Sequence, residues 1–382
     1  MEEFRVLTDI YFGENALERL SKIPYKKVFI IADPFVVSGD LIRYIRRPLE
    51  KAGIEYELFT DVVPDPPIEK VTAGVKAFLA SGCDCIVTVG GGSALDTAKS
   101  VRKIAAHMAP ERKFYLIAIP TTSGTGSEVT SFSIITNAQT QVKQTLISED
   151  MTPNEAVLDA ILVKSVPASI TADTGLDVLT HAIEAYVSTK HNEFSSALAE
   201  KAIEITGQFL FRSYSNAQDT HARNKMHVAA CIAGLAFNSA SLGLNHGMAH
   251  QLGAHFHVPH GRANAILLPV VIEYNTGITG VTRQSEVVLP CVERYCNIAR
   301  LLGLHGSNEV MTIHSLCNYL RFCANEMKIP SHLHEILPKV TLAEYEAAIP
   351  EMADHALEDS CTATNPRTPS KAEVEELFRK LW

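Results

Sequence analysis

The sequence predicts two domains of different fold class: an α/β domain with a parallel sheet over residues 1–165, and an all-helical domain over residues 166–382. The first observation is length, because 382 residues exceed what one hydrophobic core usually supports. The second is that short apolar runs alternate with helical stretches in the first part. The third is that this alternation stops near residue 166, where apolar residues continue at helical spacing.

Four apolar runs in the first part are predicted to be strands. They are "KKVFIIAD" (26–33), "EYELFTDVV" (55–63), "CDCIVTVGGGS" (83–93) and "FYLIAIPTTSGTGSE" (114–128). The stretches "LIRYIRRPLEKAG" (41–53) and "IEKVTAGVKAFLASG" (68–82) are predicted to be helices between them. Strands joined by helices pair in parallel, and ligands then bind at the carboxyl ends of the strands. The glycine-rich segments of this chain fall at those ends.

The second part is predicted to be a helical bundle. Its helical stretches are "PASITADTGLDVLTHAIEAYVS" (167–188), "SSALAEKAIEITGQFLF" (195–211), "KMHVAACIAGLAF" (225–237) and "GRANAILLPVVIEYNTG" (261–277). No low-complexity linker separates the two parts, so we expect the domains to pack closely. A cleft between two domains is then the natural place for a site.

Composition excludes several classes of function. The formal net charge of −9 argues against a nucleic-acid or anionic-membrane partner. No apolar run reaches the roughly 18 residues of a membrane-spanning helix. The first residues are acidic and resemble no secretory signal, so a cytoplasmic protein is expected. The eight cysteines form no CxxC pair and are expected to be reduced thiols.

Two glycine clusters indicate a phosphate-bearing cofactor. "GGGSALDTAKS" (90–100) places glycines between a strand and a helix, where the backbone can approach an anion and helix N–H groups point at it. Leu95 stands where a strict GxGxxG motif has its third glycine, so an ordinary tight turn is the alternative. "PTTSGTGSEVTS" (120–131) adds a second cluster rich in hydroxyl groups. Two such clusters in one sheet favour a dinucleotide.

Asp33 ends the first predicted strand and is a candidate contact for the cofactor's ribose. Its carboxylate can accept hydrogen bonds from both ribose hydroxyls, whereas it would repel a 2′-phosphate. This predicts NAD in preference to NADP. The alternative is a turn aspartate before Pro34 without a ligand.

The segment "GLNHGMAHQLGAHFHVPHG" (243–261) holds five of the chain's 15 histidines. Positions i and i+4 of a helix lie on one face, so His246 and His250 point the same way, as do Asp177 and His181 upstream. With His260, this gives a carboxylate and up to three imidazoles from separate helices. Such a set suits Fe²⁺ or Zn²⁺. A histidine taken alone is more often a structural residue.

These motifs resemble the iron-containing (group III) alcohol dehydrogenases. The resemblance lies in "GGGSALDTAK", "PTTSGTGSEVT", "GLDVLTHAIEAYVS" and "GLNHGMAHQLGAHFHVPHGRANAILLP", and it runs nearly end to end. It implies a Rossmann-like dinucleotide-binding domain followed by a helical metal-binding domain, the dehydroquinate synthase-like fold. It further implies metal ligation by Asp177, His181, His246 and His260, with His250 beside the metal and in contact with substrate.

The same resemblance places the nicotinamide cofactor, NAD(H), on a set of residues in the first domain. Asp65 in "VVPDPP" departs from relatives that carry Asn there, which puts this one contact in doubt. His255 and His257 match no functional position. The implied cofactor contacts are Asp33, Asp65, Gly91, Gly92, Ser93, Asp96, Thr121, Thr122, Thr125, Lys143 and Leu162.

The resemblance implies reversible NADH-dependent reduction of a short aliphatic aldehyde, with Fe²⁺, or alternatively Zn²⁺, as Lewis acid and His250 as proton relay. "ADTGLDVLTHAIEAYVS" and the histidine segment are similar to the 1-propanol dehydrogenases of propanediol-degrading microcompartments. From that similarity we also expect a dimer or a higher oligomer, and contact with shell proteins. Alternatives are ethanol, butanol, lactaldehyde (1,2-propanediol) and 1,3-propanediol dehydrogenases, a zinc enzyme of glycerol-dehydrogenase or dehydroquinate-synthase type, and a non-catalytic metal-binding scaffold.

Overall fold

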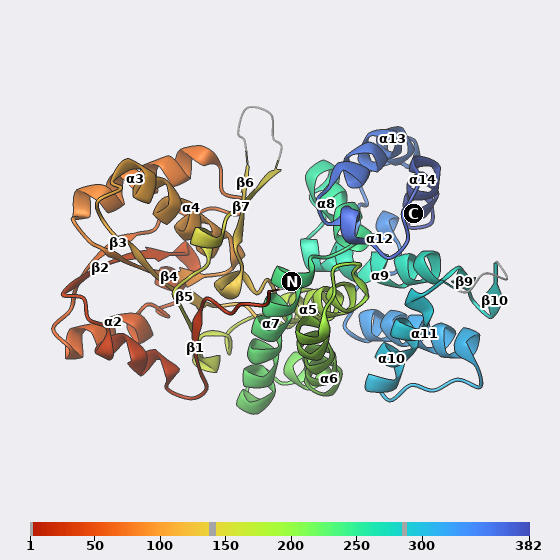
Figure 1. Ribbon diagram of the computed structural model, residues 1–382, viewed down its shortest axis with the longest axis horizontal. Helices are drawn as coiled ribbons and strands as arrows, with labels where there is room; N and C mark the ends of the chain where they lie inside the picture. The colour runs from red at the N-terminus through yellow and green to blue at the C-terminus, as the bar shows by residue number, and fades with distance from the viewer. Residues whose placement is uncertain (1–2, 137–142, 285–288) are drawn as a thin grey trace. The chain divides into compact units, whose positions relative to one another are not determined.

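The computed structural model describes residues 3–136, 143–284 and 289–382. The chain divides into two compact units, Met1–Val166 and Pro167–Trp382. Figure 1 shows strands with flanking helices in the first unit and helices almost throughout the second. A parallel-sheet unit followed by a helical unit is the architecture expected from the sequence.

A six-stranded sheet forms the centre of the first unit, in the order β1-β8-β5-β4-β2-β3. Every neighbouring pair is parallel. The chain runs from β2 outward to β3 and then returns to the other side of β2, so the strand order reverses between β2 and β4. The strands are β1 (Asp9–Phe12), β2 (Lys27–Ala32), β3 (Glu55–Phe59), β4 (Cys85–Gly90), β5 (Tyr115–Pro120) and β8 (Glu155–Leu158).

Helices cover both faces of this sheet, which explains why its central strands are continuous apolar runs. Successive residues of β2 enter different cores: Ile30 packs in one apolar cluster with Leu49, whereas Phe29 packs in another with Phe78. The helical segments of the unit are η1 (Ala16–Lys22), α1 (Pro34–Ser38), α2 (Arg43–Lys51), α3 (Ile68–Ser81), α4 (Gly92–Met108), η2 (Ser127–Val129), η3 (Glu149–Met151) and η4 (Ala160–Leu162).

An antiparallel hairpin, β6 (Phe132–Thr136) and β7 (Lys143–Ile147), is an addition to the expected α/β pattern. It interrupts the connection from β5 to β8. The hairpin is tied to α4, because Lys99 donates from Nζ to the Phe132 carbonyl at 2.9 Å and the Ser100 and Ser133 hydroxyls lie 2.9 Å apart.

The second unit is built around α5 (Ala168–Val187), whose N-cap is Pro167. Helix α5 packs against α6, α7 and α9, and α8 packs against α9 and α13. The remaining elements are α6 (Glu193–Ser215), α7 (Thr220–Ala240), α8 (Leu244–Phe256), α9 (His260–Thr276), β9 (Ile278–Thr279), β10 (Thr282–Arg283), α10 (Cys291–Leu301), α11 (Glu309–Glu326), α12 (Leu333–Ile336), α13 (Leu342–Glu358), η5 (Thr362–Thr364) and α14 (Lys371–Arg379).

Within the described residues, no single helix is long and apolar enough to cross a membrane. The bent pair α7 and α8, with 108° between them, passes that test by length and composition only. All eight cysteines are free thiols, as expected.

Candidate metal centre and nucleotide cradle

One stripe of α5 carries three buried polar side chains. Asp177, His181 and Glu184 stand at positions i, i+4 and i+7 and therefore share a face. Their exposed fractions are 3%, 4% and 4%. Buried carboxylates are costly unless they are paired or bind a metal, so this stripe marks a functional part of the helix.

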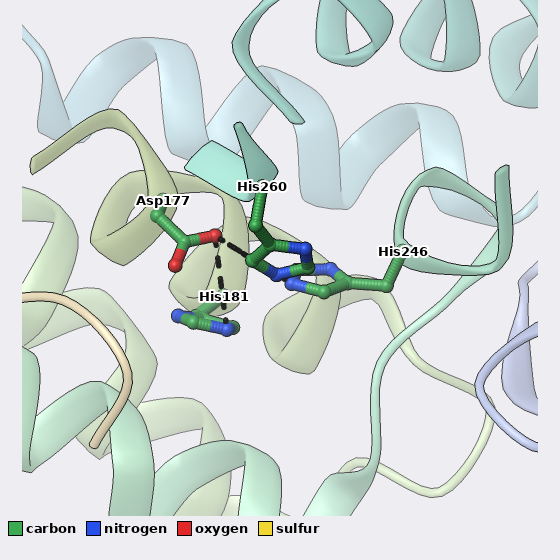
Figure 2. A group of neighbouring side chains, drawn as sticks. All are labelled: Asp177, His181, His246 and His260. Carbon is green, nitrogen blue, oxygen red and sulfur yellow. Dashed lines mark ion pairs between the residues drawn. The ribbon is translucent and has the colours of Figure 1, made fainter. Parts of the chain in front are cut away.

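The structure brings Asp177 and His181 together with two histidines from other helices. His246 lies in α8, and His260 is the first residue of α9, directly after its N-cap Pro259. One Asp177 carboxylate oxygen lies 3.9 Å from His181 Nε2, 3.7 Å from His246 Nε2 and 3.6 Å from His260 Nε2. Figure 2 shows these side chains converging, and their ligand atoms all lie within 4.8 Å of one another.

The electrostatics of this group keep its carboxylate ionised. Burial alone would raise the pKa of Asp177, but the facing imidazoles of His181, His260 and His246 outweigh it and hold this pKa well below its usual range. An ionised carboxylate is the form that binds a metal ion.

Glu184 sets the tautomer of His246. The Nδ1 atom of His246 donates a hydrogen bond to Glu184 Oε2, so Nε2 is the nitrogen that faces Asp177 and that a metal ion would bind in exchange for its proton. Burial lowers the pKa of His246, but the carboxylates of Glu184 and Asp177 raise it to about 9. Glu184 also accepts a hydrogen bond from the Asn245 backbone at 2.9 Å, so its carboxylate is fixed from two sides.

Asn264 lies at the centre of the group. Its Nδ2 atom donates to Asp177 Oδ1 at 2.7 Å and lies 3.1 Å from the Nε2 atoms of both His246 and His260. Asn245 donates from Nδ2 to Asn264 Oδ1 at 2.9 Å and so orients the amide. The amide has two N–H groups and one of them goes to Asp177, so it can donate to one of the two imidazole nitrogens, whose lone pair then points inward as ligation needs.

The donor set fits a first-row divalent ion. Three imidazole nitrogens and one carboxylate oxygen face one point, and a carboxylate orients one of the imidazoles from behind. This is the ligand chemistry of Fe²⁺ and Zn²⁺ sites, and it accepts either ion. Sequence reasoning missed Glu184 and Asn264. Their signals were helical spacing, since Glu184 follows Asp177 by seven positions and Asn264 follows His260 by four.

His250 lies beside this group and is held by an aspartate that sequence reasoning missed. Its Nδ1 atom lies 2.7 Å from Asp359 Oδ2, and its ring stacks on His260 with 5.4 Å between centroids. The Cys361 backbone N–H donates to Asp359 Oδ1 at 2.9 Å. Since an ionised carboxylate only accepts, His250 Nδ1 carries the proton and the neutral ring keeps a basic Nε2.

The other two histidines of the segment 243–261 lie outside this group. His255 is in the last turn of α8, where its Nδ1 donates to the Gln251 carbonyl at 3.2 Å. His257 ends the helix as its C-cap in the left-handed conformation, with φ of 55°.

In the first unit, the two glycine clusters face each other. Gly91 is the N-cap of α4, with no side-chain cap on the helix's N–H groups. A Cβ atom on Gly92 would lie 2.9 Å from Thr125 Cγ2, and one on Gly91 would lie 3.6 Å from Thr122 Cγ2. Glycine at 92 therefore permits the close approach of the two loops, and it leaves helix N–H groups open to an anion.

Asp33 and the glycine clusters meet at the point where the strand order reverses. The Asp33 N–H donates to the Val89 carbonyl at 3.0 Å, and the Thr121 N–H donates to the Gly90 carbonyl at 2.9 Å. The Asp33 side chain caps α1 by accepting from the Phe35 N–H at 2.8 Å. Ligands of open parallel sheets bind at such reversal points.

Asp96 and Leu162 have structural tasks of their own. The Asp96 carboxylate accepts from Ser127 Oγ at 2.7 Å and from the Ile134 N–H at 3.1 Å, so it fastens the second glycine loop to α4. Burial raises the pKa of Asp96. The Leu162 side chain is fully buried in the apolar cluster under β2, which leaves its backbone for any contact with a cofactor.

Three other expected contacts lie on a loop, at the hairpin and in the first turn of α4. Asp65 is exposed and has a left-handed φ of 49°, a conformation in which Asp and Asn are the favoured non-glycine residues. Lys143 begins β7, and its side chain lies outside the described part of the structure. Ser93 follows Gly92 in the first turn of α4.

Comparison with known proteins matches both units to one family. The family model "Iron-containing alcohol dehydrogenase" matches residues 8–160, and the model "Fe-containing alcohol dehydrogenase family, C-terminal" matches residues 171–382. The chain is 38% identical to the 1-propanol dehydrogenase PduQ of Citrobacter freundii, covering 100% of both chains. It is 37% identical to the NADPH-dependent butanol dehydrogenase of Clostridium saccharobutylicum, covering 100% of this chain and 98% of that one. Among solved structures, a 1,3-propanediol oxidoreductase superposes with a TM-score of 0.90 at 32% identity, covering 100% of both chains.

Proposed function

This chain belongs to the iron-containing alcohol dehydrogenase family, and on that premise we propose that it reduces propionaldehyde to 1-propanol with NADH, reversibly. That it is a metal-dependent alcohol dehydrogenase follows from the family and from the Asp177–His181–His246–His260 group. The choice of substrate rests on one observation, the end-to-end similarity to 1-propanol dehydrogenases of two bacteria at 37–38% identity.

Asp177, His181, His246 and His260 are the proposed metal ligands, and Fe²⁺ is the proposed ion. Bound there, the ion supplies Lewis acidity to the carbonyl oxygen, while the nicotinamide supplies the hydride. Glu184 and Asn264 keep the ligand atoms aimed at one point, as their hydrogen bonds to His246, His260 and Asp177 support.

The proposed nucleotide site lies at the reversal point of the sheet. The Gly91–Ser93 turn and the N-terminus of α4 hold the pyrophosphate, while Asp33 accepts from the ribose hydroxyls and disfavours a 2′-phosphate. Asp96 acts through the loop that it fastens. The remaining proposed contacts are Asp65, Thr121, Thr122, Thr125, Lys143 and the backbone of Leu162.

His250 is the proposed proton-handling residue. Its stacking on the proposed ligand His260 supports a role next to the carbonyl oxygen of a bound aldehyde, and Asp359 accepts a hydrogen bond from its Nδ1. Reduction of the carbonyl creates an alkoxide that needs a proton, and a protonated His250 donates one from Nε2. In alcohol oxidation the same nitrogen accepts the proton.

We also propose the setting that the 1-propanol dehydrogenase relatives suggest. The protein would work as a homodimer or a higher oligomer in the bacterial cytoplasm, enclosed with shell proteins in a microcompartment. Co-purification with shell proteins from the native cell tests this, and a purified shell fraction that lacks the protein contradicts it.

A substrate panel tests the proposed function. The purified enzyme is loaded anaerobically with Fe²⁺ or with Zn²⁺, and NADH oxidation is followed with acetaldehyde, propionaldehyde, butyraldehyde, lactaldehyde and 3-hydroxypropionaldehyde. We expect the highest kcat/KM with propionaldehyde and Fe²⁺. A higher value with butyraldehyde or a hydroxyaldehyde contradicts propionaldehyde as the substrate but agrees with metal-dependent aldehyde reduction as the reaction. Oxidation of glycerol by NAD, without aldehyde reduction, favours the glycerol-dehydrogenase alternative.

A further inference from the structure

His255 lies in a second group of ligand-type side chains, at the junction of α8 and α13. Helix α13 contributes Glu351 and His355, which stand at i and i+4 and share a face. His255 Nε2 lies 3.8 Å from Glu351 Oε2, and the His255 and His355 rings lie 6.3 Å apart between centroids. One ligand atom from each of the three residues lies within 4.8 Å of the others.

The His255 imidazole is oriented with one ring nitrogen available to a metal. Its Nδ1 is 3.2 Å from the Gln251 carbonyl oxygen, and because a carbonyl oxygen only accepts, Nδ1 must carry the proton. In the neutral ring Nε2 therefore keeps its lone pair, and Nε2 is the atom that faces Glu351. Backbone support of one ring nitrogen is the usual arrangement behind a metal-bound histidine.

The three ligand atoms need to move only slightly closer together to bind one ion. Ligand atoms around a tetrahedral zinc ion lie about 3.4 Å apart, given bonds of about 2.0–2.1 Å. The Glu351 side chain is 67% exposed and His355 is exposed as well, so both can rotate inward without disturbing packed residues. Exposure also leaves room for a water molecule as the fourth ligand.

We propose that His255, Glu351 and His355 form a second metal site, which binds one borderline divalent ion of the Zn²⁺ class. Two imidazoles and a carboxylate favour such an ion over Mg²⁺ or Ca²⁺, which prefer oxygen ligands. The site lies between two segments that also position His250. Helix α8 carries His250 itself. Asp359, which accepts from His250 Nδ1, directly follows α13, and its N–H donates to the His355 carbonyl at 3.0 Å. Metal bound here ties α8 to the end of α13.

Native mass spectrometry of the full-length protein tests this site by counting Zn²⁺ ions. The protein is first saturated at the principal site with Zn²⁺ and then titrated with ZnSO₄. We expect wild type to bind one more Zn²⁺ per chain than His255→Gln or His355→Gln. His305→Gln, which removes an exposed histidine outside the group, is the matched control and keeps the wild-type count. His355→Cys supplies a new ligand and restores the additional ion.

Thermal unfolding provides the second readout. A ligand that binds the native state stabilises it. Micromolar Zn²⁺ should therefore raise the Tm of wild type and of His305→Gln by more than it raises the Tm of His355→Gln. Mg²⁺ should raise the Tm of none of the three. Equal Zn²⁺ counts in wild type and both glutamine variants overturn the proposal. So does a Zn²⁺-dependent Tm shift that His355→Gln retains in full.

Discussion

His250 and Asp359 form a hydrogen bond, with 2.7 Å between Nδ1 and Oδ2, although 109 positions separate them in sequence. The bond orients an imidazole that lies against the proposed ligand His260. We expect His250→Ala to lower kcat by about 100-fold or more, as loss of a general acid does, and to retain the metal. Asp359→Asn should lower kcat by about tenfold, because the amide holds the Nδ1 proton less firmly. Metal content and the pH dependence of kcat are measured together; loss of metal in His250→Ala would make it a ligand instead.

The same aspartate makes stability depend on acid pH. Burial would raise the pKa of Asp359, but its hydrogen bond and charge interaction with His250, together with the Cys361 N–H, lower it to about 2. A free aspartate has a pKa of about 3.9, so the carboxylate contributes about 2 kcal/mol above pH ~4, which is lost as pH falls through ~2. The difference in unfolding free energy between wild type and Asp359→Asn should shrink over that interval in denaturant titrations. A difference that is constant with pH contradicts this.

Glu184→Gln tests the residue behind the proposed ligand His246. The amide cannot accept the Nδ1 proton as strongly as the carboxylate does, so we expect metal affinity to fall about 10–100-fold. Competition with a chelator measures it. Glu273→Gln, at a partly buried glutamate of α9 that pairs with Arg321, is a matched control and should leave metal affinity unchanged.

His260→Ala tests the ligand set itself. Bound metal and activity should fall together, with kcat lowered by at least about 1,000-fold, because several kcal/mol of Lewis-acid stabilisation are lost. Elemental analysis and NADH oxidation are the measurements. His257→Asn, a substitution that tolerates the left-handed C-cap conformation, is the control. Full activity with metal retained in His260→Ala would exclude it as a ligand.

Asp33→Ser tests the preference between nucleotides. Serine keeps the N-cap of α1 and removes the charge, so the ratio of kcat/KM with NADPH to that with NADH should rise at least about tenfold. Asp33→Gly should shift the ratio in the same direction. An unchanged ratio in both variants would show that Asp33 does not determine the preference between NADH and NADPH.

The sequence predicted the sheet from strands such as β2 and β4, whose apolar runs are long because both faces of the sheet are covered. The hairpin β6–β7 gave no comparable signal: polar residues interrupt its strands, FSIIT and KQTLI, and side chains of α4 such as Lys99 hold it. At the metal centre, i, i+4 spacing identified pairs within α5 and α8. Asp359 was missed because its contact with His250 depends on how α8 and the residues after α13 pack, which spacing within one helix does not contain.

The proposed ligands all belong to residues 167–382, and the glycine loops and Asp33 all belong to residues 1–166. Selection can therefore act on nucleotide choice and on the metal centre through different stretches of the gene. A change at Asp33 needs no compensating change on α5, α8 or α9. This separation offers a simple evolutionary route by which coenzyme preference changes while the metal centre is kept, and one relative of similar identity is named as NADPH-dependent.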